Sequence, residues 1–386
     1  MKKLFIIIFS FFVVLILNSC ISGVNQLLIS TYLEGTSSNK CIELYNFSEN
    51  EVDLSKYKIN IYGTKDKIKY SIKLKGILAA KDCFVIVNSE SSEELLNKAD
   101  FKTPNLDYGG NEAIGLLFND KLVDVVGTPG FRNVLKDKTL IRKTDMVFPR
   151  TTFDEYDYII YGIDEFDYLG DFVNSVTPAE LLEGPKFDVS YLNQDFILQT
   201  QTISKMGGGG AVEVKLQSNV DGDTAWFVFP DELDIEKFVE PSNIRYNGST
   251  MSSKVRYQDI NTPETYSGNI MEFGWPAKLY TAKVQSEADK IYIQSVKNDS
   301  LLCTYGRIMG YVFAEKNNDS VCVNYMIVLQ GYSTIAVSEN YSLTYKDIPY
   351  YGYMYNAMLY AKKNQKGLWG EVDPYWDYID NKSIFA

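Results

Sequence analysis

Histidine is absent from the 386 residues of this chain. Its absence excludes nucleophilic sites built on Ser-His-Asp or Cys-His pairs, zinc centres with imidazole ligands and any histidine general base. Hydrolysis by this chain would therefore have to use carboxylates, arginines and a hard metal ion bound through oxygen ligands.

Positive charge is scarce as well. The sequence holds 38 Lys and Arg against 50 Asp and Glu, which gives a formal net charge of -12. A chain this acidic does not attract phosphates through its overall field, so any binding of nucleic acid must come from a local site.

A long hydrophobic run is also missing. The apolar run at residues 4–17 is shorter than the roughly 18 to 20 residues that a transmembrane helix needs. Lys2 and Lys3 precede the run, and a short segment ending in Cys20 follows it, which is the order of a secretory signal. The ending resembles the lipobox of bacterial lipoproteins, with Asn18 as a departure from the usual pattern.

The lipobox predicts where the mature protein lies. We expect residues 1–19 to be a lipoprotein signal peptide and residues 20–26 a tether. Lipid on Cys20 would then hold the protein on the extracellular face of a bacterial cell membrane. The alternative is a simple secretory signal in which Cys20 is incidental. The other cysteines have no metal-ligand spacing and are either free thiols or one disulfide per domain: Cys41, Cys83, Cys303 and Cys322.

The first half of the chain is predicted to be rich in strands. Residues 27–170 alternate short apolar runs with turn signals, and only residues 92–99 have a helical pattern. The strand candidates are residues 27–32, 41–46, 57–62, 83–88, 113–117 and 122–126. This spacing suggests a β-sandwich. Glu43 and Asp124 lie within the strand patterns, and we expect them to face solvent or a sheet edge.

At these residues the segment resembles a lamin-tail domain, which is an immunoglobulin-like β-sandwich. The resemblance depends on residues 42–46, 52–57, 109–117, 123–127 and 140–143. No active site is expected in this stretch, so a role in placement or adhesion is expected, with direct binding of substrate as the alternative. Residues 171–206 have no sustained period and are predicted to be a linker. The second domain is predicted at residues 207–386, where residues 207–210 are all glycine and a strand follows at residues 211–216.

Four short motifs follow one another in the second domain. They are the Asp-Gly-Asp at residues 221–223, Arg256 with residues 261–264, the segment 304–307 and the segment 367–370. A helix is expected at residues 275–290, between the second and third motifs, and another at residues 353–363. Each motif alone is weak, because Asp-Gly-Asp is usually a turn and a single arginine is usually a surface charge. Their combined order is specific.

This order resembles the staphylococcal-nuclease-like, or thermonuclease, family over residues 211–370. The resemblance implies an α+β fold, a five-stranded OB-fold barrel with packed helices. It also implies a calcium site formed by Asp223, by Asn261 in place of the usual carboxylate, and by the backbone carbonyl of Thr262. These are oxygen donors of the kind that calcium accepts.

The same resemblance assigns the catalytic roles. Glu264 matches the carboxylate that binds the attacking water, and Arg256 and Arg307 match the two arginines that clamp the phosphate. The chemistry agrees, because phosphodiester hydrolysis needs an activated water and donors for the charged transition state. Tyr305 precedes Gly306 and either stacks on a base or sugar or packs on the barrel rim.

Two further features qualify the second domain. Residues 211–386 hold more acidic than basic side chains, so weak steering of polyanions and a strong dependence on salt and divalent cations are expected. The insertion at residues 229–253 contains several acids and is predicted to be a solvated loop, with a lid over the site as the alternative.

The sequence therefore predicts a surface-anchored, calcium-dependent nuclease that hydrolyses phosphodiester bonds in both DNA and RNA. The alternative is a surface lipoprotein that only adheres or binds nucleic acid, without cleaving it. The joint presence of Asp223, Arg256, Glu264 and Arg307 favours the enzyme, because a module that only binds does not need the full set.

Overall fold

The computed structural model describes residues 24–385 apart from positions 64, 66, 199–205, 267 and 337–342. The predicted signal peptide and Cys20 lie outside the described residues. The chain forms two compact units. Unit 1 holds the residues up to 136 with segments 147–153 and 169–171, and unit 2 holds segments 137–146 and 154–168 with residues 172 onward. Across the described stretches, no helix has the length and apolar character needed to cross a membrane.

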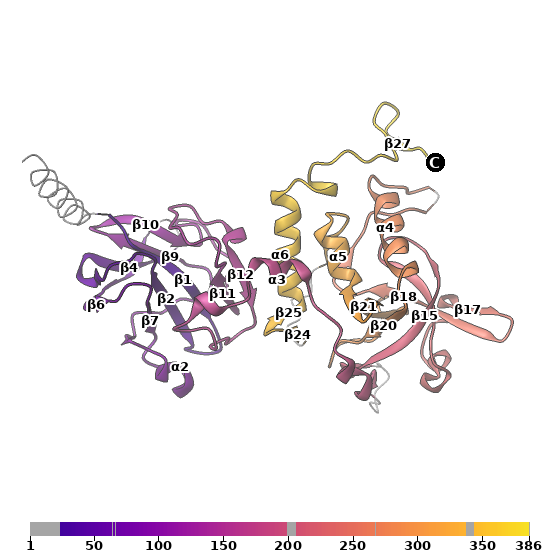
Figure 1. Ribbon diagram of the computed structural model, residues 1–386, viewed down its shortest axis with the longest axis horizontal. Coiled ribbons are helices and arrows are strands. Elements are labelled where there is room, and N and C mark those ends of the chain that lie inside the picture. Colours follow the sequence, from indigo (N-terminus) through magenta and orange to yellow (C-terminus); the bar gives the residue numbers. More distant parts are fainter. Residues whose placement is uncertain are drawn as a thin grey trace, which may run out of the picture. The chain divides into compact units, whose positions relative to one another are not determined.

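Unit 1 is a β-sandwich, as the sequence predicts (Figure 1). One sheet contains β1 (Leu27–Glu34), β2 (Lys40–Asn46), β7 (Cys83–Val87) and β8 (Phe101–Lys102) in that order. The other contains β10 (Lys121–Val126), β9 (Ala113–Phe118), β4 (Tyr57–Tyr62) and β5 (Ile68–Lys73). The predicted helix is α2 (Glu93–Asn97), and the Ser92 side chain accepts a hydrogen bond from Leu95 N at its start. The short strands β3 (Val52–Asp53) and β6 (Ile77–Leu78) pair with each other.

Local turn chemistry fixes the register between β9 and β10. Asn119 and Asp120 both have positive φ, 47° and 65°, and they form the two-residue loop between these strands. Positive φ at both loop residues is the geometry of a type I′ turn, which matches the twist of paired strands and suits Asn and Asp. The segment Asn317 and Asn318, with φ of 54° and 63°, makes the equivalent turn in unit 2.

The two acids expected at the surface of unit 1 are instead fully buried. Asp124 accepts hydrogen bonds from the backbone N of Ile29 and of Arg150, each at 2.8 Å. Glu43 accepts hydrogen bonds from Ser30 Oγ at 2.6 Å and from Gly170 N at 2.5 Å. The expectation was wrong because these carboxylates serve as acceptors for backbone and hydroxyl donors inside the fold, a role that strand alternation does not reveal.

Unit 2 contains the predicted five-stranded barrel. Its strands are β15 (Ala211–Asn219), β16 (Thr224–Val228), β18 (Thr250–Tyr257), β20 (Lys290–Gln294) and β21 (Ile308–Lys316). They follow the order β18-β16-β15-β20-β21, and a parallel pairing of β18 with β21 closes the ring. Closure leaves no unpaired barrel edge. The strands β17 (Ile244–Asn247) and β22 (Asp319–Cys322) extend the sheet from β18 and β21.

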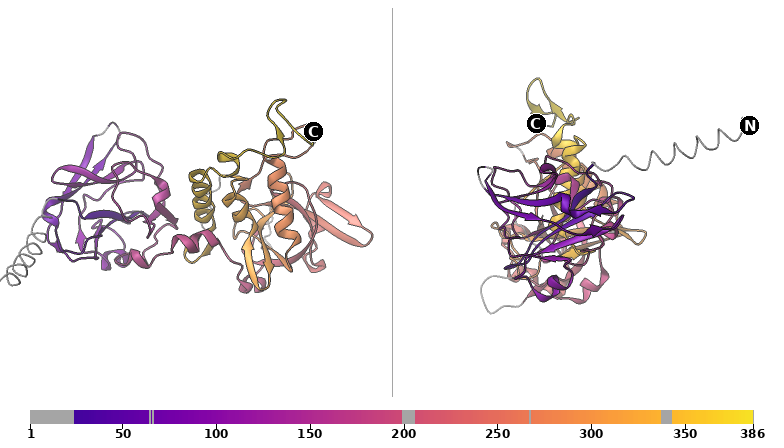
Figure 2. Two further views of the ribbon diagram at one scale, coloured as in Figure 1. Left: turned by 45° about the horizontal axis from the view of Figure 1, so that its top comes forward. Right: turned by 90° about the vertical axis from the view of Figure 1, so that its left-hand side faces the viewer.

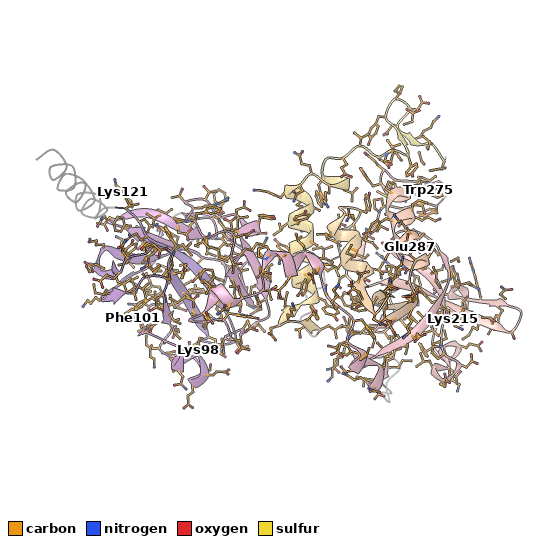
Figure 3. The ribbon with its side chains drawn as sticks, viewed as in Figure 1. Lys98, Phe101, Lys121, Lys215, Trp275 and Glu287 are labelled. Atoms are coloured by element: carbon orange, nitrogen blue, oxygen red, sulfur yellow. The ribbon has the colours of Figure 1, made fainter. Side chains whose placement is uncertain are left out.

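Unit 2 has three helices in a row, of which the first two contact strands of the sheet and the third packs on the second (Figures 1 and 2). They are α4 (Gly274–Ser286), α5 (Val323–Leu329) and α6 (Tyr350–Lys363). Trp275 lies near the start of α4 and Glu287 just beyond its end (Figure 3). Unit 2 also holds the hairpin of β11 (Lys138–Arg142) and β12 (Tyr158–Tyr161), against which α6 packs.

Two segments with weak patterns are more ordered than the sequence indicates. Between residues 172 and 198 the chain forms α3 (Pro178–Glu183), which begins with a capping box of Thr177 and Glu180. The insertion at residues 229–253 is not simply a solvated loop, because Ile235 and Val239 are buried and its last part forms β17 against β18. The remaining short strands of unit 2 are β13 (Ile197–Leu198), β14 (Met206–Gly207), β19 (Ile260–Asn261), β23 (Thr334–Ile335), β24 (Thr344–Tyr345), β25 (Ile348–Pro349), β26 (Trp376–Asp377) and β27 (Lys382–Ser383).

Candidate functional site

The Asp-Gly-Asp motif forms the tight turn that enters β16. A Cβ on Gly222 would lie 2.7 Å from Ala277 Cβ and 2.8 Å from Thr262 Cγ2, so only glycine allows this close approach. The carbonyl of Gly222 accepts a hydrogen bond of 2.8 Å from Thr281 Oγ1 on α4. The turn is therefore held against α4, and it presents Asp223 at the end of the barrel.

Asp223 is the most heavily bonded side chain of the site. Its Oδ1 lies 2.5 Å from Nη1 of Arg256, and its Oδ2 accepts a hydrogen bond of 2.6 Å from the backbone N of Thr262. Nη2 of Arg256 donates to Asn261 Oδ1 at 2.8 Å. The Arg256 guanidinium thus bridges the two side-chain oxygens that the sequence assigns to calcium.

The parallel pairing of β18 with β21 brings the second arginine to the same place. Val255 pairs with Ile308 and Arg256 with Met309, so Arg307 enters β21 beside the end of β18. Both arginines line one open cleft of about 350 Å³, together with Tyr305 and Cys303. The cleft is concave, borders two guanidinium groups and is large enough for a phosphate and its neighbouring sugar.

Glu264 and Asp221 place further negative charge beside Asp223. Glu264 is partly exposed and follows the buried Pro263. The pKa of Asp221 is raised to about 7, first by burial and then by the negative charges of Asp223 and Glu264. Asp221 therefore lies within electrostatic range of both Asp223 and Glu264. Asp221 was not among the predicted site residues, although the Asp-Gly-Asp motif was the signal for it.

The donor chemistry fits a hard cation. Within the described part of the chain, no group of three or more His, Cys, Asp or Glu side chains is arranged to hold a metal ion. Oxygen donors are nonetheless gathered at Asp223, Asn261 and Thr262, and the buried hydroxyl of Thr262 has no hydrogen-bond partner among the described residues. A site with one or two carboxylates suits a divalent cation that keeps several water or phosphate ligands.

Tyr305 and Cys303 form the turn that leads to Arg307. Tyr305 is 76% exposed, and its ring centroid is 5.6 Å from Arg307 Cζ. The Cys303 Sγ accepts a hydrogen bond from Arg307 Nε at 3.4 Å. Burial raises the pKa of this thiol, but hydrogen bonds from Arg307 and the backbone, together with the Arg307 charge, outweigh burial and lower it. Sequence reasoning missed Cys303 as a cleft residue, because only the turn brings it there.

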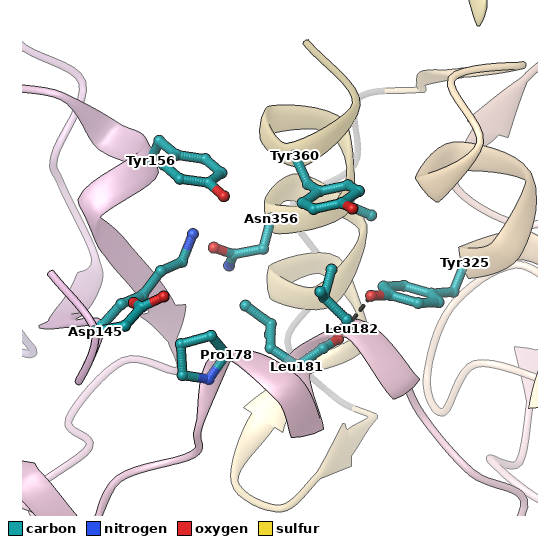
Figure 4. A pocket seen from close by; sticks show the side chains of 10 residues that line it. Asp145, Tyr156, Pro178, Leu181, Leu182, Tyr325, Asn356 and Tyr360 are labelled. Carbon is teal, nitrogen blue, oxygen red and sulfur yellow. Dashed lines mark hydrogen bonds between the residues drawn. The ribbon is translucent and has the colours of Figure 1, made fainter. Parts of the chain in front are cut away.

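A second cavity in unit 2 lies among α3, α5 and α6 (Figure 4). It holds only about 30 Å³ and is lined mainly by apolar and aromatic groups. The Tyr325 hydroxyl donates to the Leu181 carbonyl at its edge, at 2.6 Å. A space of this size admits about one water molecule, and none of the predicted site residues lines it. The cleft at the end of β18 is therefore the candidate site, because Arg256, Tyr305 and Arg307 line it. The other predicted site residues do not line this cleft: Asp223, Asn261, Thr262 and Glu264.

Comparison with known proteins agrees with the predicted families of the two domains. Residues 22–130 match the Lamin Tail Domain family, and residues 254–371 match the family of staphylococcal nuclease homologues. The chain therefore contains a segment similar to the lamin tail domain, followed by a segment similar to staphylococcal nuclease homologues. Both resemblances drawn from the sequence are confirmed, and so is the mainly β fold of two domains. The predicted domain boundaries and site residues stay predictions.

A characterised relative shares part of the sequence. Endonuclease YhcR of Bacillus subtilis (strain 168) is 30% identical over 155 residues. The match covers 36% of this chain and 11% of the relative, so the chain spans only a small part of that protein's length. The staphylococcal nuclease match includes Arg256, Asn261, Glu264 and Arg307, whereas Asp223 precedes it.

Proposed function

We propose that this chain is a calcium-dependent nuclease that hydrolyses phosphodiester bonds of DNA and RNA without distinguishing the sugar. The observation that carries the proposal is the cleft lined by both Arg256 and Arg307. Two planar guanidinium forks that border one cleft match the oxygens of a single phosphate group better than two lysines would. The staphylococcal nuclease match and the endonuclease relative support the same reaction class.

Each residue of the site has a distinct part in the proposed reaction. Water attacks phosphorus while the bond from phosphorus to the leaving oxygen breaks. Glu264 orients the water and accepts its proton, since no histidine is present to do so. Arg256 and Arg307 donate N–H groups to the phosphate oxygens on which negative charge develops. Calcium, when bound at Asp223, Asn261 and Thr262, would neutralise charge on those oxygens.

Tyr305 supplies an aromatic surface at the mouth of the cleft. Its side chain is exposed and lies beside Arg307, so a base next to the scissile phosphate could stack on it. Stacking on an aromatic ring is worth about 1 to 3 kcal/mol per base and tolerates any sequence. The contact therefore suits a nuclease without sequence preference.

The decisive test is cleavage in gels that contain DNA or RNA, with either calcium or a chelator. Glu264→Gln should lower cleavage by about 100-fold or more. Glu287→Gln is the matched control, because Glu287 is an exposed acid just beyond α4. Equal clearing by all three proteins would reject the mechanism. Nucleic acid that is bound but never cut, at any calcium concentration, would support a binding protein instead.

We further propose that the enzyme acts at the outer surface of the cell, through lipid on Cys20. The support is the sequence order of two lysines, an apolar run and the lipobox-like ending. Cys20→Ser should release the protein from the membrane fraction and abolish labelling by a radioactive fatty acid. A Cys20→Ser protein that stays in the membrane fraction would contradict this anchor.

A further inference from the structure

The hairpin of β17 and β18 carries two cations on the same face as Arg256. Along β18, Lys254 and Arg256 are two residues apart, so their side chains leave the same face of the sheet. Arg245 on β17 pairs with Ser252, which is on that face as well. Figures 1 and 2 show this hairpin extending beyond the barrel.

Trp226 holds both cations in place. It pairs with Lys254 across β16 and β18, and the indole is buried beneath the two side chains. Arg245 Cζ is 3.9 Å from the centroid of its ring and Lys254 Nζ is 5.0 Å from it. A cation stacked on an indole loses little further conformational entropy when it binds an anion. Arg245 and Lys254 are therefore preorganised for an anionic ligand.

Arg245, Lys254 and Arg307 form no ion pair with any described residue, whereas Arg256 is paired with Asp223. Lys254 is close enough to the others for their charges to act on it. Its pKa is lowered by burial first and then by the positive charges of Arg307 and Arg245, and the negative charge of Asp221 opposes this shift in part. Three unpaired cations together are unusual in a chain with a net charge of -12.

The side chains of Arg256, Lys254 and Arg245 form a row of cations, and its length is comparable to the spacing of phosphates along a nucleic-acid strand. From Arg256 to Ser252 the chain advances four residues, which is about 13 Å along a strand. That length exceeds the rise of about 3.4 Å per phosphate of one strand in a duplex, so the row spans more than one phosphate. The row begins at the cleft, where Arg256 and Arg307 lie, and ends at Arg245 on the projecting hairpin.

We propose that Arg245 and Lys254 form a phosphate-binding track that guides the substrate strand into the cleft. The track contacts phosphates on one side of the scissile bond and compensates locally for the acidity of the domain. This inference rests on the proposed nuclease function, because the strand it binds is the substrate. It adds two binding residues and a direction of approach along β18.

The test measures binding of single-stranded oligonucleotides to the full chain in the Glu264→Gln background, by fluorescence anisotropy at several salt concentrations. Each phosphate contact contributes about 0.7 to the slope of log K against log salt for a single strand. The double variant Arg245→Gln/Lys254→Gln should therefore lower the slope by about 1.4. Lengthening the strand from a dinucleotide to about 12 nucleotides, within the range that OB folds bind, should strengthen binding less in the variant.

Two further variants separate the track from folding and from general charge. Arg245→Lys/Lys254→Arg keeps both cations over Trp226 and should retain the original slope. Lys290→Gln/Lys316→Gln removes two exposed cations at the opposite end of β21 from Arg307, roughly 26 Å along the strand. This control should leave the slope unchanged, because both lysines form exposed ion pairs far from the cleft.

Each result of these binding measurements either supports or overturns the phosphate-binding track. An unchanged slope and length dependence in Arg245→Gln/Lys254→Gln would overturn the track, while cleavage by the unmodified chain would keep the proposed function intact. An equal loss in the Lys290 and Lys316 control would also overturn it, because total charge would then explain the effect. A chain that never cleaves but loses binding through Arg245 and Lys254 would reject the nuclease and retain the track.

Discussion

Arg256 forms an ion pair with Asp223, with its Nη1 2.5 Å from the carboxylate Oδ1. The Arg256 side chain is 15% exposed and that of Asp223 is 6% exposed, so the pair is largely removed from water. Arg307 lines the same cleft but has no ion pair with a described residue. Two arginines with the same predicted role in phosphate binding therefore differ in what they do for the fold.

Substitution should separate these roles. Arg256→Gln leaves a buried carboxylate without its cation, so the free energy of unfolding should fall by about 3 kcal/mol. Arg307→Gln, the matched control, should change it by about 0.5 kcal/mol or less. Both should lower cleavage by about 100-fold or more, because each removes a phosphate ligand. Urea unfolding followed by tryptophan fluorescence measures unit 2 alone, since all four tryptophans lie there.

Asn261→Asp should strengthen the binding of a divalent cation. The substitution adds a carboxylate beside Asp223, where an amide oxygen now accepts a hydrogen bond from Arg256. We expect calcium affinity to rise about tenfold, which equals about 1.4 kcal/mol, and the melting temperature to rise more on calcium addition than in the unmodified chain. Asn261→Ala is the control and should weaken the calcium effect. Equal calcium responses in all three proteins would remove Asn261 from the site.

The strongly patterned elements of the fold could be predicted from sequence. Residues 57–62 form β4 as expected, and the predicted helix at 353–363 begins three residues earlier in α6, directly after Pro349. The structure of residues 229–253 could not be predicted, because the many acids in this segment indicate a solvated loop although Ile235 and Val239 are buried. The burial of Glu43 could not be predicted either, since the alternation of residues along a strand does not show which acids accept hydrogen bonds inside the fold.

The predicted members of the site stay predictions, and the sequence could not give their contacts. The order of the motifs indicated a resemblance to the nuclease family, and that resemblance implied the roles of Arg256, Glu264 and Arg307. The ion pair of Arg256 with Asp223 depends on the register of β16 and β18, in which Thr224 pairs with Arg256. No local pattern encodes that register. For the same reason the stacking of Arg245 and Lys254 on Trp226 becomes visible only in three dimensions.

Cys303 should be more reactive than the buried thiols Cys41 and Cys322. It borders the cleft and its pKa is lowered, whereas Cys41 and Cys322 are buried with raised pKa values, that of Cys322 to about 12. All four described cysteines are free thiols. A bulky maleimide at neutral pH should label Cys303 before Cys41 and Cys322, as peptide mass spectrometry would reveal, and should block cleavage by filling the cleft. Cleavage by Cys303→Ser should resist the reagent, and labelling of Cys41 ahead of Cys303 would contradict the assignment.

The buried Glu43 should make the stability of unit 1 depend on pH. Burial, only partly opposed by hydrogen bonds from Ser30, Gly170 and Thr31, raises its pKa from 4.5 to about 7. Between these two values the folded state holds a proton that the unfolded chain has released. The contribution of Glu43 to the free energy of unfolding should therefore fall by about 3 kcal/mol as the pH rises from 4.5 through 7.

Glu43→Gln should remove this decline, because an amide stays neutral throughout that range. The measurement is urea unfolding at several pH values, followed by far-ultraviolet circular dichroism for the whole chain and by tryptophan fluorescence for unit 2. The difference between variant and unmodified chain should grow with pH in the first signal and stay near zero in the second, since unit 1 contains no tryptophan. A difference that is the same at pH 5 and pH 8 would mean that Glu43 keeps an ordinary pKa and that its donors fully offset burial.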